Sequence, residues 1–224
     1  MTIKEKIEHF VLDVLVIHDA PKVDINKKHI ACIGDSITFG AGVGGIKNET
    51  WEHFLEEKIG NEYQVLNYGI SGRTLQDEGD YPYTKEEYFK ISQDINADIY
   101  LIMLGTNDTK PFNWNEERFK KELNDFVSTY INLENKPKVI LMTPPACFPE
   151  ESLKIVAFEI NEEIINGPVY DIVSNCAKNH GIQLIDLYNH TKDHSEWFID
   201  GVHPNIHGNK EFAEFIYQNI KEIL

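Results

Sequence analysis

The stretch His29-Ile30-Ala31-Cys32-Ile33-Gly34-Asp35-Ser36 decides the fold, because an apolar, β-branched run ends abruptly in a small polar turn. Such a run, bounded by turn residues, is typical of a buried strand. Four further runs of this kind follow it, and segments with helical spacing separate them. The predicted strands are residues 29–33, 63–66, 98–104, 138–142 and 182–185.

The segments between these strands predict helices on both faces of the sheet. A strand-helix-strand series of this kind gives parallel strands with right-handed crossovers, and therefore a three-layer αβα sandwich of the α/β class. The predicted helices are residues 50–59, 85–94, 115–132, 159–179 and 205–223.

The chain is expected to form a single domain. Its 224 residues, 42% of them hydrophobic, are enough for one sizeable core. Residues 29–224 contain the strand-helix series. Residues 1–28 are predicted to be an N-terminal extension that packs on this domain as a helix or an added strand, with residues 21–28 as the linker.

Charge and composition exclude several classes of partner. The net charge of -16 disfavours nucleic acid and anionic lipid surfaces. The apolar run at residues 10–17 is short and contains Asp13, so neither a signal peptide nor membrane insertion is expected. The three cysteines lack a CxxC pair, which favours reduced thiols and a cytoplasmic location. A homo-oligomer stays open.

Three strands end in turns that could carry chemistry. Residues 34–38, 67–73 and 105–108 are small and polar, and they follow the first three strands. Ligands of open parallel sheets bind beyond the carboxyl ends of the strands. These three turns therefore predict a site at one edge of the sheet.

Residues 200–204 supply a base and an acid for a serine in that site. A serine attacks a carbonyl carbon when a histidine takes its proton and a carboxylate holds the histidine in the right tautomer. His203 and Asp200 fit these roles for Ser36. The developing oxyanion needs hydrogen-bond donors, for which the Ser36 N–H, the Gly72 N–H and the Asn107 side-chain amide are candidates.

In order along the chain, residues 34–36, 67–72, 105–108 and 200–204 resemble the four signature blocks of the SGNH (GDSL-type) hydrolases. The resemblance implies a flavodoxin-like five-stranded sheet, Ser36 as nucleophile, Gly72 and Asn107 as oxyanion donors, and His203 as base with Asp200 behind it. Ile37 stands where the family name has Leu. Asp35 is expected to organise the turn below Ser36.

Each of these residues also has a purely structural interpretation. Ser36 could cap a helix, and Asp200 could cap the last one. Asn107 could form an Asx turn, Gly72 could simply need a positive φ, and His203 could be a loop histidine. The four blocks together favour the catalytic interpretation.

Two other patterns point to different chemistry and are weaker. The GxGxxG pattern at residues 40–45 is also typical of Rossmann oxidoreductases, but its first glycine lies six residues beyond Gly34, where the first strand ends. The pairs His190/His194 and His203/His207 have metal-ligand spacing without an HExxH motif. No metal and no organic cofactor are expected.

The predicted function is a serine esterase that acts on a small-molecule ester, with a short-chain O-acetyl esterase of a carbohydrate as the first choice. Asp35, Arg73 and Trp197 are the candidate substrate-binding residues, and residues 143–159 are expected to shape the pocket wall. A long apolar tunnel there would favour a lysophospholipase or acyl thioesterase. A non-catalytic carbohydrate-binding module is the alternative from another class.

Overall fold

Five parallel strands in the order β2-β1-β3-β4-β5 form the centre of the computed structural model, which describes residues 16–44, 46–149 and 158–224. This is the flavodoxin-like order, and the chain changes direction across the sheet between β1 and β3. The predicted α/β fold and all five strands are confirmed. The strands are β1 (Lys28–Gly34), β2 (Tyr63–Gly69), β3 (Ile99–Met103), β4 (Lys138–Met142) and β5 (Gln183–Ile185).

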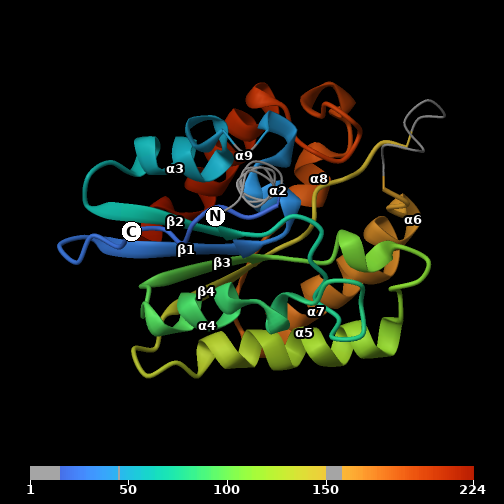
Figure 1. Cartoon of the computed structure of the whole chain (residues 1–224), viewed down its shortest axis with the longest axis horizontal. Helices are drawn as coiled ribbons and strands as arrows, with labels where there is room; N and C mark the ends of the chain where they lie inside the picture. The colour runs from blue at the N-terminus through green and yellow to red at the C-terminus, as the bar shows by residue number, and fades with distance from the viewer. Residues whose placement is uncertain (1–15, 45, 150–157) are drawn as a thin grey trace, which may run out of the picture.

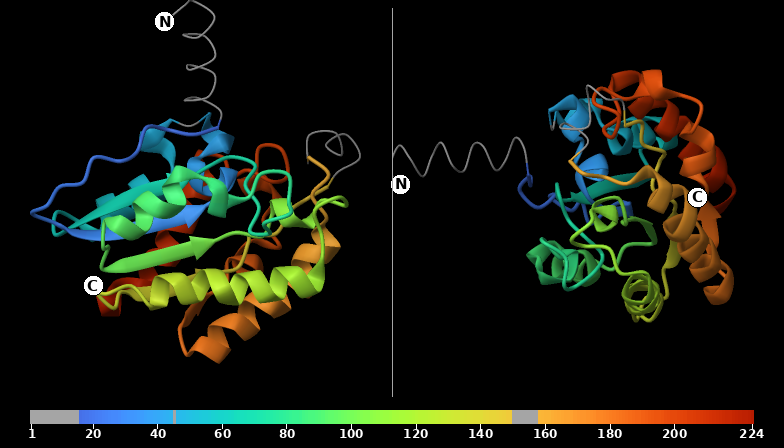
Figure 2. Two further views of the ribbon diagram at one scale, coloured as in Figure 1. Left: turned by 60° about the horizontal axis from the view of Figure 1, so that its bottom comes forward. Right: turned by 90° about the vertical axis from the view of Figure 1, so that its right-hand side faces the viewer.

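Helices cover both faces of the sheet (Figure 1). On one face lie α3 (Trp51–Ile59) and α9 (Ile206–Ile220), which contact each other. On the other face lie α4 (Glu87–Asp94), α5 (Glu116–Ile131) and α7 (Tyr170–His180), and α5 and α7 pack side by side (Figures 1 and 2). Short elements connect these layers: α2 (Ser36–Phe39), α6 (Glu162–Ile164), α8 (Leu187–Thr191), a π turn (Ile165–Val169) and 3-10 turns at Ala41–Val43, Lys47–Glu49, Tyr83–Lys85, Asn107–Thr109, Ser195–Trp197 and Lys221–Ile223.

The two cores follow from the alternation of side chains along each strand. In β1, Ile30 and Cys32 belong to the core under α3 and α9, whereas Ala31 and Ile33 belong to the core under α4, α5 and α7. Successive residues of a strand point to opposite faces, so a strand covered on both sides must be apolar throughout. This burial keeps β1 fixed and with it the turn that follows.

The predicted helix at 159–179 is wrong in its first half. The helical turn begins at Glu162, where the Asn161 side chain caps it by accepting a hydrogen bond from the Ile164 N–H at 3.2 Å. Gly167 then has a non-helical backbone, with φ -98° and ψ -105°. The ring of Pro168, which has no N–H to donate, interrupts regular helix pairing. A continuous helix therefore starts only at Tyr170.

The described part of the N-terminal extension, residues 16–27, forms no strand and lies against the domain. The Val16 carbonyl accepts a hydrogen bond from the Ser71 N–H at 2.8 Å. The His18 ring stacks on Phe39 with 4.3 Å between ring centroids. Residues 1–15 lie outside the described residues, so the packing of the whole extension stays a prediction.

Candidate active site

Ser36 lies at the start of α2, directly beyond β1, which is paired with β2 on one side and β3 on the other. Asp35 caps this helix, because its Oδ1 accepts a hydrogen bond from the Ile37 N–H at 3.0 Å. The turn is tight: a Cβ at Gly34 would lie 2.2 Å from Thr38 Oγ1 and 2.8 Å from the Met103 carbonyl oxygen. The position before Asp35 therefore requires a glycine.

His203 lies in a loop that is stabilised by hydrogen bonds to Asp200. Asp200 Oδ1 accepts hydrogen bonds from the Val202 N–H at 3.0 Å and from the His203 N–H at 2.7 Å. The other oxygen, Oδ2, lies 2.7 Å from Nδ1 of the His203 ring. Gly201 has φ +82°, a conformation that side chains disfavour, and this lets the chain turn back on Asp200.

The fold brings these two segments together across 167 residues of sequence, with 2.8 Å between His203 Nε2 and Ser36 Oγ. The candidate nucleophile, base and acid thus form one line of contacts, in the arrangement that the sequence predicts for Ser36, His203 and Asp200. The glycine-rich loop holds them in place: a Cβ at Gly42 would lie 2.1 Å from the Pro204 carbonyl oxygen. Gly42 lies beyond α2 and permits a close approach of two backbones, whereas a dinucleotide fingerprint would begin directly after β1.

Two aspartates at the site have opposite electrostatic environments. Burial raises the pKa of Asp200, but hydrogen bonds from the His203 ring and backbone and from the Val202 N–H outweigh it and lower the pKa overall. Asp200 therefore stays ionised beside His203. Burial raises the pKa of Asp35 to about 6, although the Ile37 N–H and the nearby His203 oppose the shift.

A cavity of about 430 Å³ opens above Ser36. A cavity of this size accepts a small substrate and places polar groups near its reacting bond. It contains five of the predicted site residues, namely the three catalytic candidates and both oxyanion candidates. Its lining residues are Ser36, Ala41, Ser71, Gly72, Thr106, Asn107, Lys110, Phe158, Ile160, Asp200, Val202 and His203.

Besides Ser36, the two other oxyanion candidates, Gly72 and Asn107, line the cavity. Gly72 has φ +80°, and no heavy atom lies within 4 Å of the position a Cβ would take. The Asn107 amide nitrogen donates to the Arg73 carbonyl at 3.2 Å and makes a long contact of 3.4 Å with Asp35 Oδ2. Asp35 thus lies beneath the site, where it supports both the turn and Asn107.

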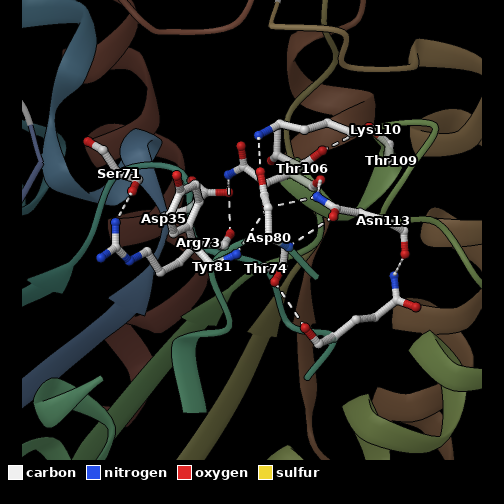
Figure 3. Close-up of polar contacts among 12 residues, drawn as sticks. Asp35, Ser71, Arg73, Thr74, Asp80, Tyr81, Thr106, Thr109, Lys110 and Asn113 are labelled. Atoms are coloured by element: carbon white, nitrogen blue, oxygen red, sulfur yellow. Dashed lines mark hydrogen bonds and ion pairs between the residues drawn. The ribbon is translucent and has the colours of Figure 1, made fainter. Parts of the chain in front are cut away.

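None of the three predicted substrate-binding residues is among the described residues that line the cavity: Asp35 is buried beneath it, and Arg73 and Trp197 are held by other partners. The Arg73 guanidinium donates to Glu86 Oε1 at 2.7 and 2.9 Å. It also donates to the Ser71 carbonyl (Figure 3). Trp197 packs in the core under α9, and its ring stacks on His194 at 3.9 Å between centroids. Arg73 follows Gly72 in sequence, but its side chain turns away from the cavity.

The sequence alone does not indicate the contacts of several other residues of the site. Buried Asp108 accepts hydrogen bonds from the Leu75 N–H at 2.9 Å and the Gln76 N–H at 2.8 Å, and so anchors the segment that follows Gly72. Burial raises the pKa of Asp108 to about 6 against these two bonds. The Phe158 ring meets His203 edge-on at 5.7 Å and comes from the predicted wall at 143–159, of which residues 150–157 lie outside the described residues. Lys110 lies in the wall three residues after Asn107.

The histidine pairs are occupied in other contacts. The His190 ring stacks on Phe215 at 3.9 Å between centroids, and His194 lies on Trp197. Within residues 16–44, 46–149 and 158–224, the His, Cys, Asp and Glu side chains form no group of three that could hold a metal ion. In the same ranges every helix is too short or too polar to cross a bilayer.

Comparison with known proteins agrees with this geometry. The model of the GDSL-like lipase/acylhydrolase family matches residues 30–216. The chain belongs to this family. The predicted family resemblance is confirmed, and the match includes all four sequence blocks.

An acetylxylan esterase of Xylanibacter ruminicola is 33% identical to this chain over 221 residues. That match includes 90% of this chain and 44% of the relative, so the chain spans less than half of that protein.

Among solved structures, an aryl esterase of M. smegmatis has 21% identity and a TM-score of 0.70, with 88% of this chain and all of that chain covered. A carbohydrate acetylesterase of Sinorhizobium meliloti has 18% identity and a TM-score of 0.70 at the same coverage. These two likenesses support the fold.

Proposed function

We propose that the chain is a serine esterase that removes short acyl groups, acetyl above all, from a carbohydrate or a similar polar alcohol. The observation that carries the proposal is the line of contacts from Asp200 through His203 to Ser36 at the floor of the 430 Å³ cavity. The family match and the acetylxylan esterase relative support ester hydrolysis and an acetylated sugar as the substrate.

The first half of the reaction forms an acyl-enzyme. Ser36 Oγ bonds to the ester carbonyl carbon while His203 Nε2 takes its proton, and ionised Asp200 stabilises the charged imidazole. The carbonyl electrons move to the oxygen, which the Ser36 and Gly72 N–H groups and the Asn107 amide would stabilise. The carbonyl then re-forms, the bond to the alcohol oxygen breaks, and His203 gives its proton to that oxygen.

The second half releases the acid. Water attacks the acyl carbon as His203 takes one of its protons, and the bond to Ser36 Oγ breaks as His203 returns the proton to the serine. One ester and one water thus give one alcohol and one acid. His203 and Asp200 end in their starting protonation states.

The test is hydrolysis of p-nitrophenyl esters from acetate to palmitate by the wild type and by Ser36→Ala. We expect turnover of the short esters and a loss of about 10⁴-fold or more in Ser36→Ala, since removal of a nucleophile leaves only binding and oxyanion stabilisation. Thr129→Ala, on the exposed side of α5, is the control for substitution as such.

Three other results would change the assignment. A preference for long acyl chains would move it to a lysophospholipase or acyl thioesterase. Turnover that survives in Ser36→Ala would overturn the mechanism. Binding of acetylated sugars without turnover would favour the carbohydrate-binding module.

A further inference from the structure

Lys110 introduces a cation into the cavity of an acidic protein. Among the described residues that line the cavity it is the single lysine or arginine, and its side chain is 12% exposed. The other charged group in the wall beside the catalytic histidine, Asp200, is engaged with His203. Lys110 plays no part in the proposed acyl transfer, so its position requires another explanation.

Asp80 holds the Lys110 ammonium in place. Lys110 Nζ donates to Asp80 Oδ2 at 3.2 Å, and Asp80 Oδ1 accepts from the Asn113 amide at 2.9 Å and from the Tyr81 N–H at 3.1 Å. The Asp80 N–H in turn donates to Asn113 Oδ1 at 3.0 Å. Figure 3 shows the Lys110 side chain running from its backbone beside Thr109 to the carboxylate of Asp80.

The same network connects Lys110 to the oxyanion candidate. The buried Asn113 amide also donates to the Asn107 carbonyl oxygen, at 3.0 Å. Asn107 and Lys110 also lie in one short segment, at the start of a 3-10 turn and at its end. The ammonium is therefore fixed relative to the point where the ester carbonyl would lie, as a group that reads the substrate must be.

The charge balance indicates what Lys110 would bind. An ammonium has three N–H donors and Asp80 accepts one of them, which leaves two donors on a side chain that lines the cavity. The pair is neutral as a unit, and the protein as a whole carries -16, which disfavours a second anion at this place. An uncharged oxygen acceptor fits this environment better.

We propose that Lys110 determines specificity by donating a hydrogen bond to a hydroxyl or ring oxygen of a neutral carbohydrate, beside the ester that Ser36 attacks. This inference rests on the proposed function and names the alcohol part of its substrate. Esters of alcohols without such an oxygen lose this contact.

The experiment compares two acetyl esters that differ in the alcohol. We would measure kcat/KM of the wild type, Lys110→Met and Lys110→Arg on a monoacetylated neutral methyl glycoside and on p-nitrophenyl acetate. In Lys110→Met the ratio of the glycoside to the aryl value should fall about 10- to 100-fold, the usual effect of losing a hydrogen bond from a charged donor. The fall should lie mainly in KM, and Lys110→Arg should restore part of it.

Controls separate a substrate contact from damage to the site. Lys121→Met removes a lysine whose partner Asp125 lies on the exposed side of α5, and its ratio should equal that of the wild type. The urea midpoint of each variant shows whether it is folded.

Equal losses on both esters would overturn the inference, because Lys110 would then act through Asn107 and not on the sugar. A larger loss on an acetylated uronic acid than on the neutral glycoside would overturn it as well. If the wild type hydrolyses neither ester, the proposed function itself fails, which is a different result from a wild type that is active with an unchanged ratio in Lys110→Met.

Discussion

The turn that carries Ser36 and the loop that carries His203 are built in different ways. The Ser36 turn depends on distant parts of the chain: β1 lies between β2 and β3, and Gly34 fits against the Met103 backbone. The His203 loop is local, because Asp200 binds the histidine ring and two backbone N–H groups within three residues. His203, the proposed base, is thus held mainly by bonds to nearby Asp200, whereas Ser36, the proposed nucleophile, is held in place by the sheet.

The contact between Asp200 and His203 can be removed by replacing one oxygen of the Asp200 side chain. Asp200→Asn keeps an oxygen for the Val202 and His203 N–H groups but puts an amide where Oδ2 faces Nδ1. The ring then adopts the tautomer that carries its proton on Nε2 and cannot accept one from Ser36. We expect kcat to fall by about 10³- to 10⁴-fold with little loss of stability.

The comparison for this variant is kcat of Asp200→Asn against Asp186→Asn, since Asp186 caps α8 away from the cavity. A loss below tenfold in Asp200→Asn would show that His203 does not need this acid.

The contact of Gly42 with Pro204 connects the segment after the Ser36 turn to the His203 loop. A methyl group at Gly42 would meet the Pro204 carbonyl at 2.1 Å and push the His203 loop away from Ser36. Misplacement of a catalytic group by about 1 Å can cost about 10²-fold, so we expect a kcat loss of about 10- to 100-fold. Overpacking should also reduce the free energy of unfolding by about 1–3 kcal/mol.

Thr129→Ala is again the control for substitution as such, because Thr129 lies on α5 away from both regions. If Gly42→Ala has wild-type kcat, the two regions do not depend on this contact.

The smallest expected effect is a change in the pH dependence of stability, caused by Asp35 beneath Ser36. With a pKa raised to about 6, folded Asp35 binds a proton where the unfolded chain, at its ordinary value, has lost it. Stability therefore falls as the pH rises through 6, by roughly 1 kcal/mol between about pH 5.5 and 7.5 for this one group. Asp35→Asn should remove this part of the slope and keep the helix cap, because Asn caps as well as Asp.

Urea unfolding at several pH values measures this slope. An unchanged slope in Asp35→Asn would assign the proton to another group, of which buried Asp108, with its pKa also raised to about 6, is the first to test.

Most of the fold could be predicted because it depends on local patterns. The strands are apolar runs that end in polar turns, and burial on both faces of a parallel sheet demands such runs. The failure at 159–179 has a local cause as well, since Gly167-Pro168 is a signal for a break. The helical spacing of apolar residues on either side of Gly167-Pro168 nevertheless predicts one continuous helix.

The site was predictable where one short segment holds the whole arrangement, as at residues 200–204. Arg73 and Trp197 show the limit: both are close to site residues in sequence, but the direction of each side chain depends on partners elsewhere, Glu86 for Arg73 and the core under α9 for Trp197. Lys110 shows the converse, because its partner Asp80 lies 30 residues away. Tertiary pairs of this kind leave no pattern along a single sequence.

The self-contained form of residues 200–204 also bears on how the protein loses activity. These residues lie in a loop that meets Ser36, Gly42 and Phe148, whereas Ser36 follows a strand that is paired on both sides. Loops outside the strand ladder open at lower free energy than a strand paired on both sides. Opening of the His203 loop would thus separate base from nucleophile while the sheet stays folded, and the amide hydrogens of β1 would stay protected from exchange when those of Val202 and His203 do not. Inactivation by mild heat or urea would then precede unfolding and reverse on cooling or dilution.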